Sequence, residues 1–127
     1  MNIAVFCSAN ADIDPRFYEA TAALGRWCAE KGHTVIFGGT NLGLMECVAK
    51  AAHEVGGRVV GVVPKFVEEG GKESTYMDEV YHCENLTDRK EMLNTLCDVA
   101  VALPGGVGTL EELLEVITWK QLGLFLK

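Results

Sequence analysis

Strand-like and helix-like patterns alternate along this chain, and that alternation limits the folds open to it more than any other feature. Short, mostly apolar runs predict five strands buried on both faces: NIAVFC, HTVIFGG, RVVGVVP, VYHCE and DVAVALP. Amphipathic spacing predicts four helices, over residues 15–31, 44–55, 87–96 and 109–122. Because neighbouring parallel strands need a crossover, usually a right-handed helix, this order predicts a doubly wound, Rossmann-like α/β sheet with helices on both faces.

One stretch, residues 65–79, does not follow this pattern. It is polar, contains two glycines and shows no clear period. We expect a surface loop here that could act as a lid.

Length and charge narrow the class of protein. The 127 residues, 49% of them hydrophobic, suffice for one core and predict a single domain over residues 1–127. Eleven Lys and Arg against eighteen Asp and Glu give a net charge of −7 without a basic stripe, which disfavours nucleic-acid and anionic-membrane binding. The apolar runs are shorter than a membrane span and no signal peptide is visible, so we expect a soluble cytoplasmic protein.

The cysteines point to core positions and not to a metal or disulfide site. Five cysteines are widely spaced, with no CxxC pair. We expect them to be reduced. His82 and Cys83 would lie on opposite faces of a strand and could not easily chelate one ion, so no metal site is predicted.

Two of the predicted strands end in glycine-rich stretches, FGGTNLG and LPGGVG. Both would emerge at the carboxyl edge of the sheet, where ligands of such folds bind. Glycine lets the backbone approach an anion, and the following helix offers unpaired N–H groups, so phosphate is the expected ligand. Glycines in a tight turn can also be purely structural, but two such stretches at one edge favour binding. GxGxxG and the Walker pattern are absent, which argues against an NAD enzyme and a P-loop NTPase.

Arg89 lies in line with the apolar stripe of its predicted helix, at the i, i+3, i+4, i+7 spacing that it shares with Met92, Leu93 and Leu96. A cation in the first turn of a helix costs about 0.3–1 kcal/mol against the helix dipole. Either an anion compensates, from a ligand phosphate or a carboxylate such as Glu112, or the guanidinium reaches water over an apolar stem. The pattern leaves both readings open.

Glu112 has a structural and a functional reading. With Thr109 it matches the S/T-x-x-E capping box, in which the glutamate bonds back to the cap residue's N–H. A capping glutamate belongs to the helix end that would face the ligand, so the two roles are compatible.

These residues together carry a family resemblance. The stretch PGGVGTLEE, Pro104–Glu112, matches a PGGxGTxxE hallmark, and DRKEML supplies an Arg–Lys pair at Arg89 and Lys90. FGGTNLGLM and EELLEVITWKQLG agree as well. The chain resembles, over essentially its whole length, the LONELY GUY family of cytokinin-activating nucleotide hydrolases, long labelled possible lysine decarboxylases.

The resemblance implies hydrolysis of the N-glycosidic bond of a nucleoside 5′-monophosphate, a cytokinin riboside monophosphate or an AMP-like nucleotide, to free base and ribose 5-phosphate. No cofactor is implied. Arg89 and Glu112 would be the catalytic pair, with the carboxylate stabilising an oxocarbenium-like ribose and Arg89 fixing the glutamate or polarising the leaving base. The 5′-phosphate would be held by Gly105, Gly106, Gly108 and Thr109. The remaining implied nucleotide-binding positions are Gly38, Gly39, Thr40, Gly43, Met45, Lys90 and Val107.

The chain departs from the family pattern at several places. Thr40 and Glu46 stand where the family usually has glycine, and CSANAD replaces its usual glycine-serine stretch after the first strand. Family members continue beyond the position of Lys127 with at least one more strand and helix, so the expected fold is short at its C-terminus. We expect dimerisation, domain swapping or a shortened variant of the fold to cover the resulting sheet edge, and we expect a homodimer because family members are commonly dimers. Trp119 would lie either in that interface or in the core.

Two other functions remain open from the sequence. One is a non-catalytic nucleotide carrier similar to the molybdenum-cofactor carrier proteins, which the departures at Thr40 and Glu46 favour. The other is a degenerate member of the family that serves as a dimeric interaction module. The expected partner is a nucleoside monophosphate or a related phosphorylated small molecule in the first two cases.

Overall fold

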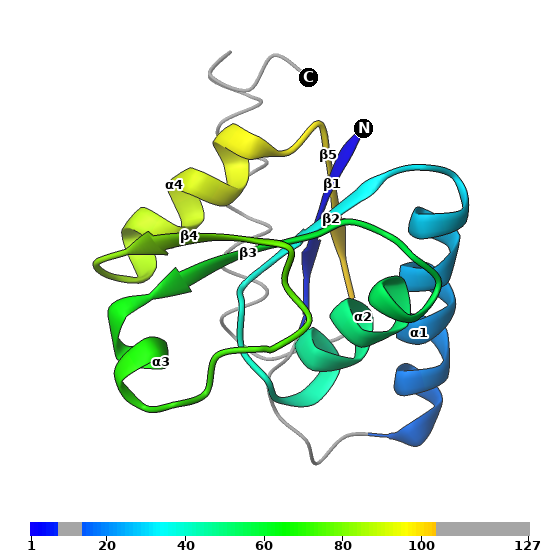
Figure 1. The fold of residues 1–127 in the computed structure, drawn as a ribbon, viewed down its shortest axis with the longest axis horizontal. Coiled ribbons are helices and arrows are strands. Elements are labelled where there is room, and N and C mark those ends of the chain that lie inside the picture. The colour runs from blue at the N-terminus through cyan, green and yellow to red at the C-terminus, as the bar shows by residue number, and fades with distance from the viewer. Residues whose placement is uncertain (8–13, 104–127) are drawn as a thin grey trace.

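The protein folds around one five-stranded parallel sheet, as predicted (Figure 1). The computed structural model describes residues 1–7 and 14–103. Along the chain the elements are β1 (Asn2–Phe6), α1 (Pro15–Glu30), β2 (Thr34–Phe37), α2 (Gly43–Glu54), β3 (Val59–Pro64), α3 (Lys65–Glu69), β4 (Glu79–Cys83), α4 (Leu86–Leu96) and β5 (Val99–Ala102). The helix predicted over residues 109–122 lies outside the described residues.

The strand order is β4-β3-β2-β1-β5, so the direction of winding reverses once. From β1 the chain steps outward through β2, β3 and β4, and α4 then returns it to the far side of β1, where Ile3 pairs with Val99. Right-handed crossovers in opposite directions place their helices on opposite faces. Accordingly, α1 and α2 lie together on one side of the sheet in Figure 1 and α4 lies on the other.

Two apolar layers make up the core, one on each face of the sheet. Successive residues of β1 divide between them: Ile3 and Val5 face α1 and α2, while Ala4 and Phe6 face α4. Leu93 is the main anchor of α4 in the second layer and is 1% exposed. Burial on both faces explains why the strands read as continuous apolar runs.

Local signals fix the beginnings of two of the helices that flank the sheet, α1 and α4. Asp14 caps α1, its carboxylate accepting a hydrogen bond from the Arg16 backbone N–H at 2.9 Å, and Pro15 takes the first helical position. The Arg16 side chain, which also pairs with Asp14, holds the pKa of that carboxyl below its usual value. Asn85 caps α4 in the same way, accepting from the Asp88 N–H at 2.9 Å.

The structure of residues 65–79 differs from the plain surface loop that the sequence predicts. Their first five residues form α3, and Val67 and Ser74 are buried. Tyr76 and Met77 pack against the core layer beneath α2. The apolar pair Phe66 and Val67 is too short to establish a helical period in the sequence, so packing against β3 decides the structure here.

Candidate functional site

The turn between β2 and α2, residues 38–43, lies at the carboxyl edge of the sheet, and we call it the glycine turn. Gly39 has a φ of +80°, and a Cβ there would lie 2.4 Å from Val63 Cγ2. Only glycine fits such a position. The backbone of the turn is tied to the chain that follows α3: Asn41 N–H donates to Lys72 O at 2.8 Å and Ser74 N–H donates to Gly39 O at 2.9 Å.

Arg89 extends from the first turn of α4 to this glycine turn. Its Nη1 donates a long hydrogen bond to Gly38 O at 3.4 Å, while its Nε is buried without a hydrogen-bond partner among the described residues. A Cβ on Gly38 would come within 3.0 Å of Nη1, so glycine is needed for this approach. A buried Nε–H of a charged guanidinium costs free energy when it has no acceptor. Arg89 is therefore positioned to donate a hydrogen bond to a further acceptor.

A pocket of about 450 Å³ opens beside Arg89 and is called here the arginine pocket. It lies where the glycine turn, α3 and the start of α4 meet. Its lining consists of Thr40, Leu42, Met45, Phe66, Val67, Gly70, Lys72, Leu86 and Arg89. Among the described residues this lining is mainly apolar, carries two cations and contains no carboxylate. Such a pocket suits a ligand that is partly apolar and partly anionic.

The residues predicted to bind nucleotide do not all play the same part in this geometry. Thr40, Met45 and Arg89 line the arginine pocket. Gly38, Gly39 and Gly43 shape the glycine turn through their backbones. Lys90 is half-buried on α4 and is not part of the lining. The predicted residues Gly105, Gly106, Val107, Gly108, Thr109 and Glu112 lie outside the described residues.

Sequence reasoning missed the opposite wall of the pocket, made by Phe66, Val67 and Lys72, and also its rim at Leu42 and Leu86. For the apolar residues among these, the only sign in the sequence of a buried or binding position is an apolar side chain within a polar stretch, as at Phe66. That signal is common in loops and does not reveal which side chains meet in space.

Thr40 and Glu46, two of the departures from the family pattern, are both bonded to residues 72–74. Thr40 Oγ1 donates to Lys72 O at 3.2 Å, and Glu46 Oε1 accepts from Ser74 Oγ at 2.7 Å. A carboxylate in the first turn of α2 is also favoured by the helix dipole. Glu46 lines a separate pocket between α1 and α2 and is not among the described residues that line the arginine pocket.

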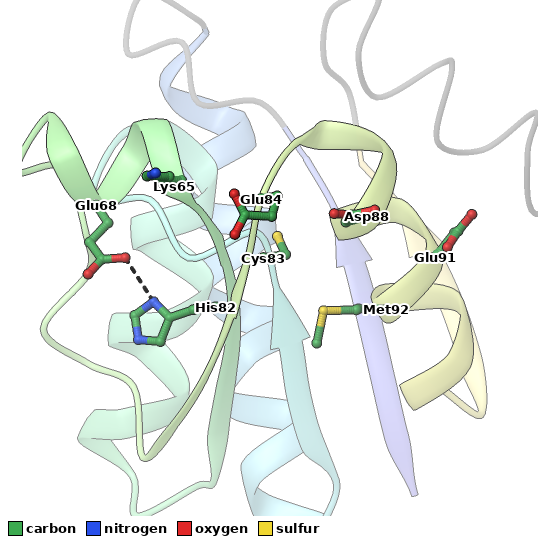
Figure 2. A pocket seen from close by; sticks show the side chains of 8 residues that line it. All are labelled: Lys65, Glu68, His82, Cys83, Glu84, Asp88, Glu91 and Met92. Atoms are coloured by element: carbon green, nitrogen blue, oxygen red, sulfur yellow. Dashed lines mark ion pairs between the residues drawn. The ribbon is translucent and has the colours of Figure 1, made fainter.

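A second cavity, of about 530 Å³, lies between α3, β4 and α4 and has the opposite electrostatic character (Figure 2). It is lined by Lys65, Glu68, His82, Cys83, Glu84, Asp88, Glu91 and Met92. His82 points toward Glu68, with Nδ1 3.1 Å from its carboxylate, whereas Cys83 packs toward the α4 layer. Burial raises the pKa of the Cys83 thiol. Across residues 1–7 and 14–103, no three His, Cys, Asp or Glu side chains gather as a metal-binding group.

The described residues also give the state of the cysteines and the character of the helices. All five cysteines are thiols without a disulfide, and Cys7, Cys28 and Cys97 are buried. None of the helices in this part has the length and hydropathy needed to cross a bilayer.

Fold and pocket together define a class: a Rossmann-like α/β protein with a ligand pocket at the carboxyl edge of its sheet. A family model described as "Possible lysine decarboxylase" matches residues 45–127, and the chain belongs to this family.

Individual relatives agree with this assignment. The cytokinin riboside 5′-monophosphate phosphoribohydrolase LOG7 of Arabidopsis thaliana is 40% identical over 125 residues, which cover 98% of this chain and 58% of the relative. The enzyme LOG of Oryza sativa subsp. japonica, which has the same activity name, is 38% identical over 98% of this chain and 52% of its own length. The chain thus spans just over half the length of these relatives.

Among solved structures, the molybdenum cofactor carrier protein of Chlamydomonas reinhardtii superposes with a TM-score of 0.83 at 27% identity, covering 94% of this chain and 71% of that one. The fold is therefore shared by proteins whose names assign them different functions.

Proposed function

We propose that this protein hydrolyses the N-glycosidic bond of a nucleoside 5′-monophosphate, a cytokinin riboside monophosphate or an AMP-like nucleotide, and releases the base and ribose 5-phosphate. The observation that carries this proposal is the placement of Arg89: its guanidinium enters a mainly apolar pocket, and its buried Nε has no partner among the described residues. The names of the relatives at 38–40% identity support the same reaction.

The reaction needs a carboxylate that stabilises positive charge on the ribose and a site that holds the 5′-phosphate. Departure of the base leaves positive charge on the ribose, as in glycoside hydrolysis, and the Glu112 carboxylate is proposed to stabilise it and to orient the attacking water. Gly105, Gly106, Val107, Gly108 and Thr109 are proposed to hold the 5′-phosphate through backbone and hydroxyl donors. Arg89 then either fixes Glu112 or polarises the leaving base.

The first glycine stretch would have a different part in this reaction. Asn41 N–H and the Thr40 hydroxyl already donate to Lys72 O, so these two donors are engaged by the chain itself. We therefore propose that Gly38, Gly39, Thr40, Gly43 and Met45 contact the nucleoside end of the ligand, with Lys90 on α4 as a further contact.

Product analysis tests the proposed function. The chain is incubated with AMP and with N6-isopentenyl-AMP, and the mixture is separated by chromatography. Free base and ribose 5-phosphate in equal amounts are expected. Glu112→Gln should abolish turnover and leave nucleotide binding, measured by calorimetry, nearly unchanged. Intact nucleotide after long incubation with the wild type would contradict the proposal.

A second candidate is a carrier of a phosphorylated cofactor, favoured by the close superposition on the molybdenum cofactor carrier protein. Mass spectrometry of the purified protein distinguishes the two functions. A carrier retains an intact phosphorylated ligand and does not convert added nucleotide, whereas the proposed hydrolase releases a free base.

A further inference from the structure

The segment between α3 and β4 has a single buried residue with which to hold its place. Figure 1 shows it passing beside the beginning of α2 on its way to β4. From residue 68 to residue 75 every residue is exposed or half-buried except Ser74, which is 5% exposed. A stretch with so little buried apolar surface is weakly stabilised by packing, so its hydrogen bonds decide where it lies.

Ser74 forms these hydrogen bonds to two other parts of the chain at once. Its N–H donates to Gly39 O at 2.9 Å, and its hydroxyl donates to Glu46 Oε1 at 2.7 Å. The hydroxyl oxygen also accepts from the Tyr76 N–H at 3.2 Å. A serine hydroxyl has one proton and a carboxylate has none to give, so the proton of Ser74 points to Glu46. The carboxylate therefore fixes the direction of this side chain.

Glu46 has no competing side-chain partner among the described residues. Lys50, one turn further along α2, pairs with Glu54 at 3.9 Å. Glu46 itself is half-buried in the first turn of α2, where the helix dipole favours a negative charge. A hydrogen bond from a hydroxyl to a carboxylate is also stronger than one between neutral groups. Glu46 is thus well placed to hold Ser74.

The glycine turn connects this pair to Arg89. Gly39 O accepts from Ser74, and the preceding carbonyl, Gly38 O, accepts from Arg89 Nη1 at 3.4 Å. A hydrogen bond of that length is close to the limit of a useful contact. A small rotation of the peptide between Gly38 and Gly39 therefore decides whether the guanidinium keeps its acceptor.

We propose that Glu46 is a positioning residue for the reaction: by holding Ser74 it fixes the glycine turn, and through the turn it fixes the guanidinium of Arg89. Glu46 is not among the described residues that line the arginine pocket, so it acts on Arg89 and not on the ligand. The inference rests on the proposed function for the identity of the reaction, and it adds a residue on which the geometry of Arg89 depends.

Three replacements of Glu46 separate its position from its charge. Glu46→Gln keeps an acceptor oxygen at the same reach, Glu46→Asp keeps the charge but is shorter, and Glu46→Ala removes both. With N6-isopentenyl-AMP, kcat per folded protein should fall by about tenfold in the Ala and Asp variants while KM stays within about twofold. The Gln variant should be close to the wild type. A Gln variant as slow as the Ala variant would overturn the inference.

A second arm repeats Glu46→Ala in the Arg89→Gln background. If Glu46 acts through Arg89, its loss should then change kcat by less than about twofold, because residues that act as one unit are not additive. A purely structural role predicts the same loss in both backgrounds, and that result would contradict the proposal. Glu54→Ala is the matched control, since Glu54 lines the same pocket between α1 and α2 but pairs with Lys50, and kcat should stay at its wild-type value.

Amide hydrogen exchange keeps this test separate from that of the proposed function. The N–H groups of Asn41 and Ser74 join the glycine turn to the segment, bonding to Lys72 O and Gly39 O. In Glu46→Ala both should exchange about tenfold faster than in the wild type, relative to amides of β3, and Glu46→Gln should change them little. Faster exchange in a protein that hydrolyses neither AMP nor N6-isopentenyl-AMP would contradict the proposed function and still support Glu46 as the residue that holds the turn. Unchanged exchange in Glu46→Ala would overturn the inference whatever the activity.

Discussion

Arg89 shows how a single residue links the fold to the proposed chemistry. The sequence places it in line with the apolar stripe of α4 but leaves its direction open. The structure resolves that choice, because packing of Leu93 against the sheet turns this face of α4 inward and carries Nη1 to Gly38 O. Such a direction depends on how two distant segments pack, and a helical period alone does not contain it.

Gly38→Ala should impair turnover much more than stability. The added methyl would lie 3.0 Å from Arg89 Nη1 and 3.0 Å from Met45 Sδ, so both side-chain ends must shift. Displacement of a reacting group by less than an ångström or so can lower the rate by about tenfold to a hundredfold. We expect kcat/KM for N6-isopentenyl-AMP to fall by about that range while the melting temperature changes little, because both neighbours are flexible.

Gly32→Ala is the contrasting control at this scale. Gly32 has a φ of +74° with open space around it and lies at the end of α1, away from the pocket. Alanine is strained there and should cost about 1 kcal/mol of folding stability, with no change in kcat/KM. Equal kinetic losses in both glycine variants would show that Gly38 acts only through stability.

At the scale of elements, the segment that joins α3 to β4 is held against the glycine turn by a set of polar contacts. An isolated bridge pairs Thr40 with Glu73, and Ser74 Oγ donates to Glu46 while accepting from the Tyr76 N–H at 3.2 Å. These contacts make the segment a fixed wall of the arginine pocket, in place of the lid that its polar sequence indicates.

Ser74→Ala tests this attachment. The change removes two hydrogen bonds at a buried side chain and leaves Glu46 without that donor, so the free energy of unfolding should fall by about 1–3 kcal/mol in urea denaturation. Glu46→Gln, which keeps an acceptor oxygen, should cost less. Glu54→Gln on the same helix breaks only an exposed pair with Lys50 and should change stability by less than about 0.5 kcal/mol. Equal effects of Ser74→Ala and Glu54→Gln would argue against a fixed wall.

The elements differ in how far the sequence foretold them. All five strands and the helices α1, α2 and α4 match their predicted positions within a residue or two, because strands buried on both faces give apolar runs and Asp14 followed by Pro15 marks the start of α1. The helix α3 and the wall residues Phe66 and Lys72 were not predicted. The helix α3 packs against β3, which directly precedes it, and the segment around Lys72 bonds to the glycine turn, which is distant in the sequence. Neither kind of contact leaves a periodic signal in the sequence.

The whole molecule combines a doubly wound sheet with a fully reduced set of cysteines. Cys28, on the buried face of α1, is 0% exposed in the first core layer, and burial raises its thiol pKa. In the unfolded chain a thiol loses its proton near pH 8.5, while Cys28 in the folded protein keeps it to higher pH. The folded state then binds more protons than the unfolded state, so stability must fall as the pH rises from the ordinary thiol pKa toward the raised one.

A melting series between pH 7 and pH 10 measures this contribution. The wild type should lose melting temperature above about pH 8.5, and Cys28→Ala should show a flatter decline over the same interval even though its stability at pH 7 is lower. Parallel declines in the two proteins would mean that Cys28 does not contribute to the pH dependence.

The central claim for the molecule is that its chemistry takes place beside Arg89, at the carboxyl edge of the sheet. The most direct test is the kcat of Arg89→Gln with N6-isopentenyl-AMP, measured together with the dissociation constant. Arg58→Gln serves as control, since Arg58 precedes β3 at the opposite edge and pairs with Glu79. The account predicts a fall in kcat of about a hundredfold or more for Arg89→Gln, equivalent to about 2.7 kcal/mol of transition-state stabilisation, with a much smaller change for Arg58→Gln. A kcat for Arg89→Gln that equals the wild-type value would contradict it.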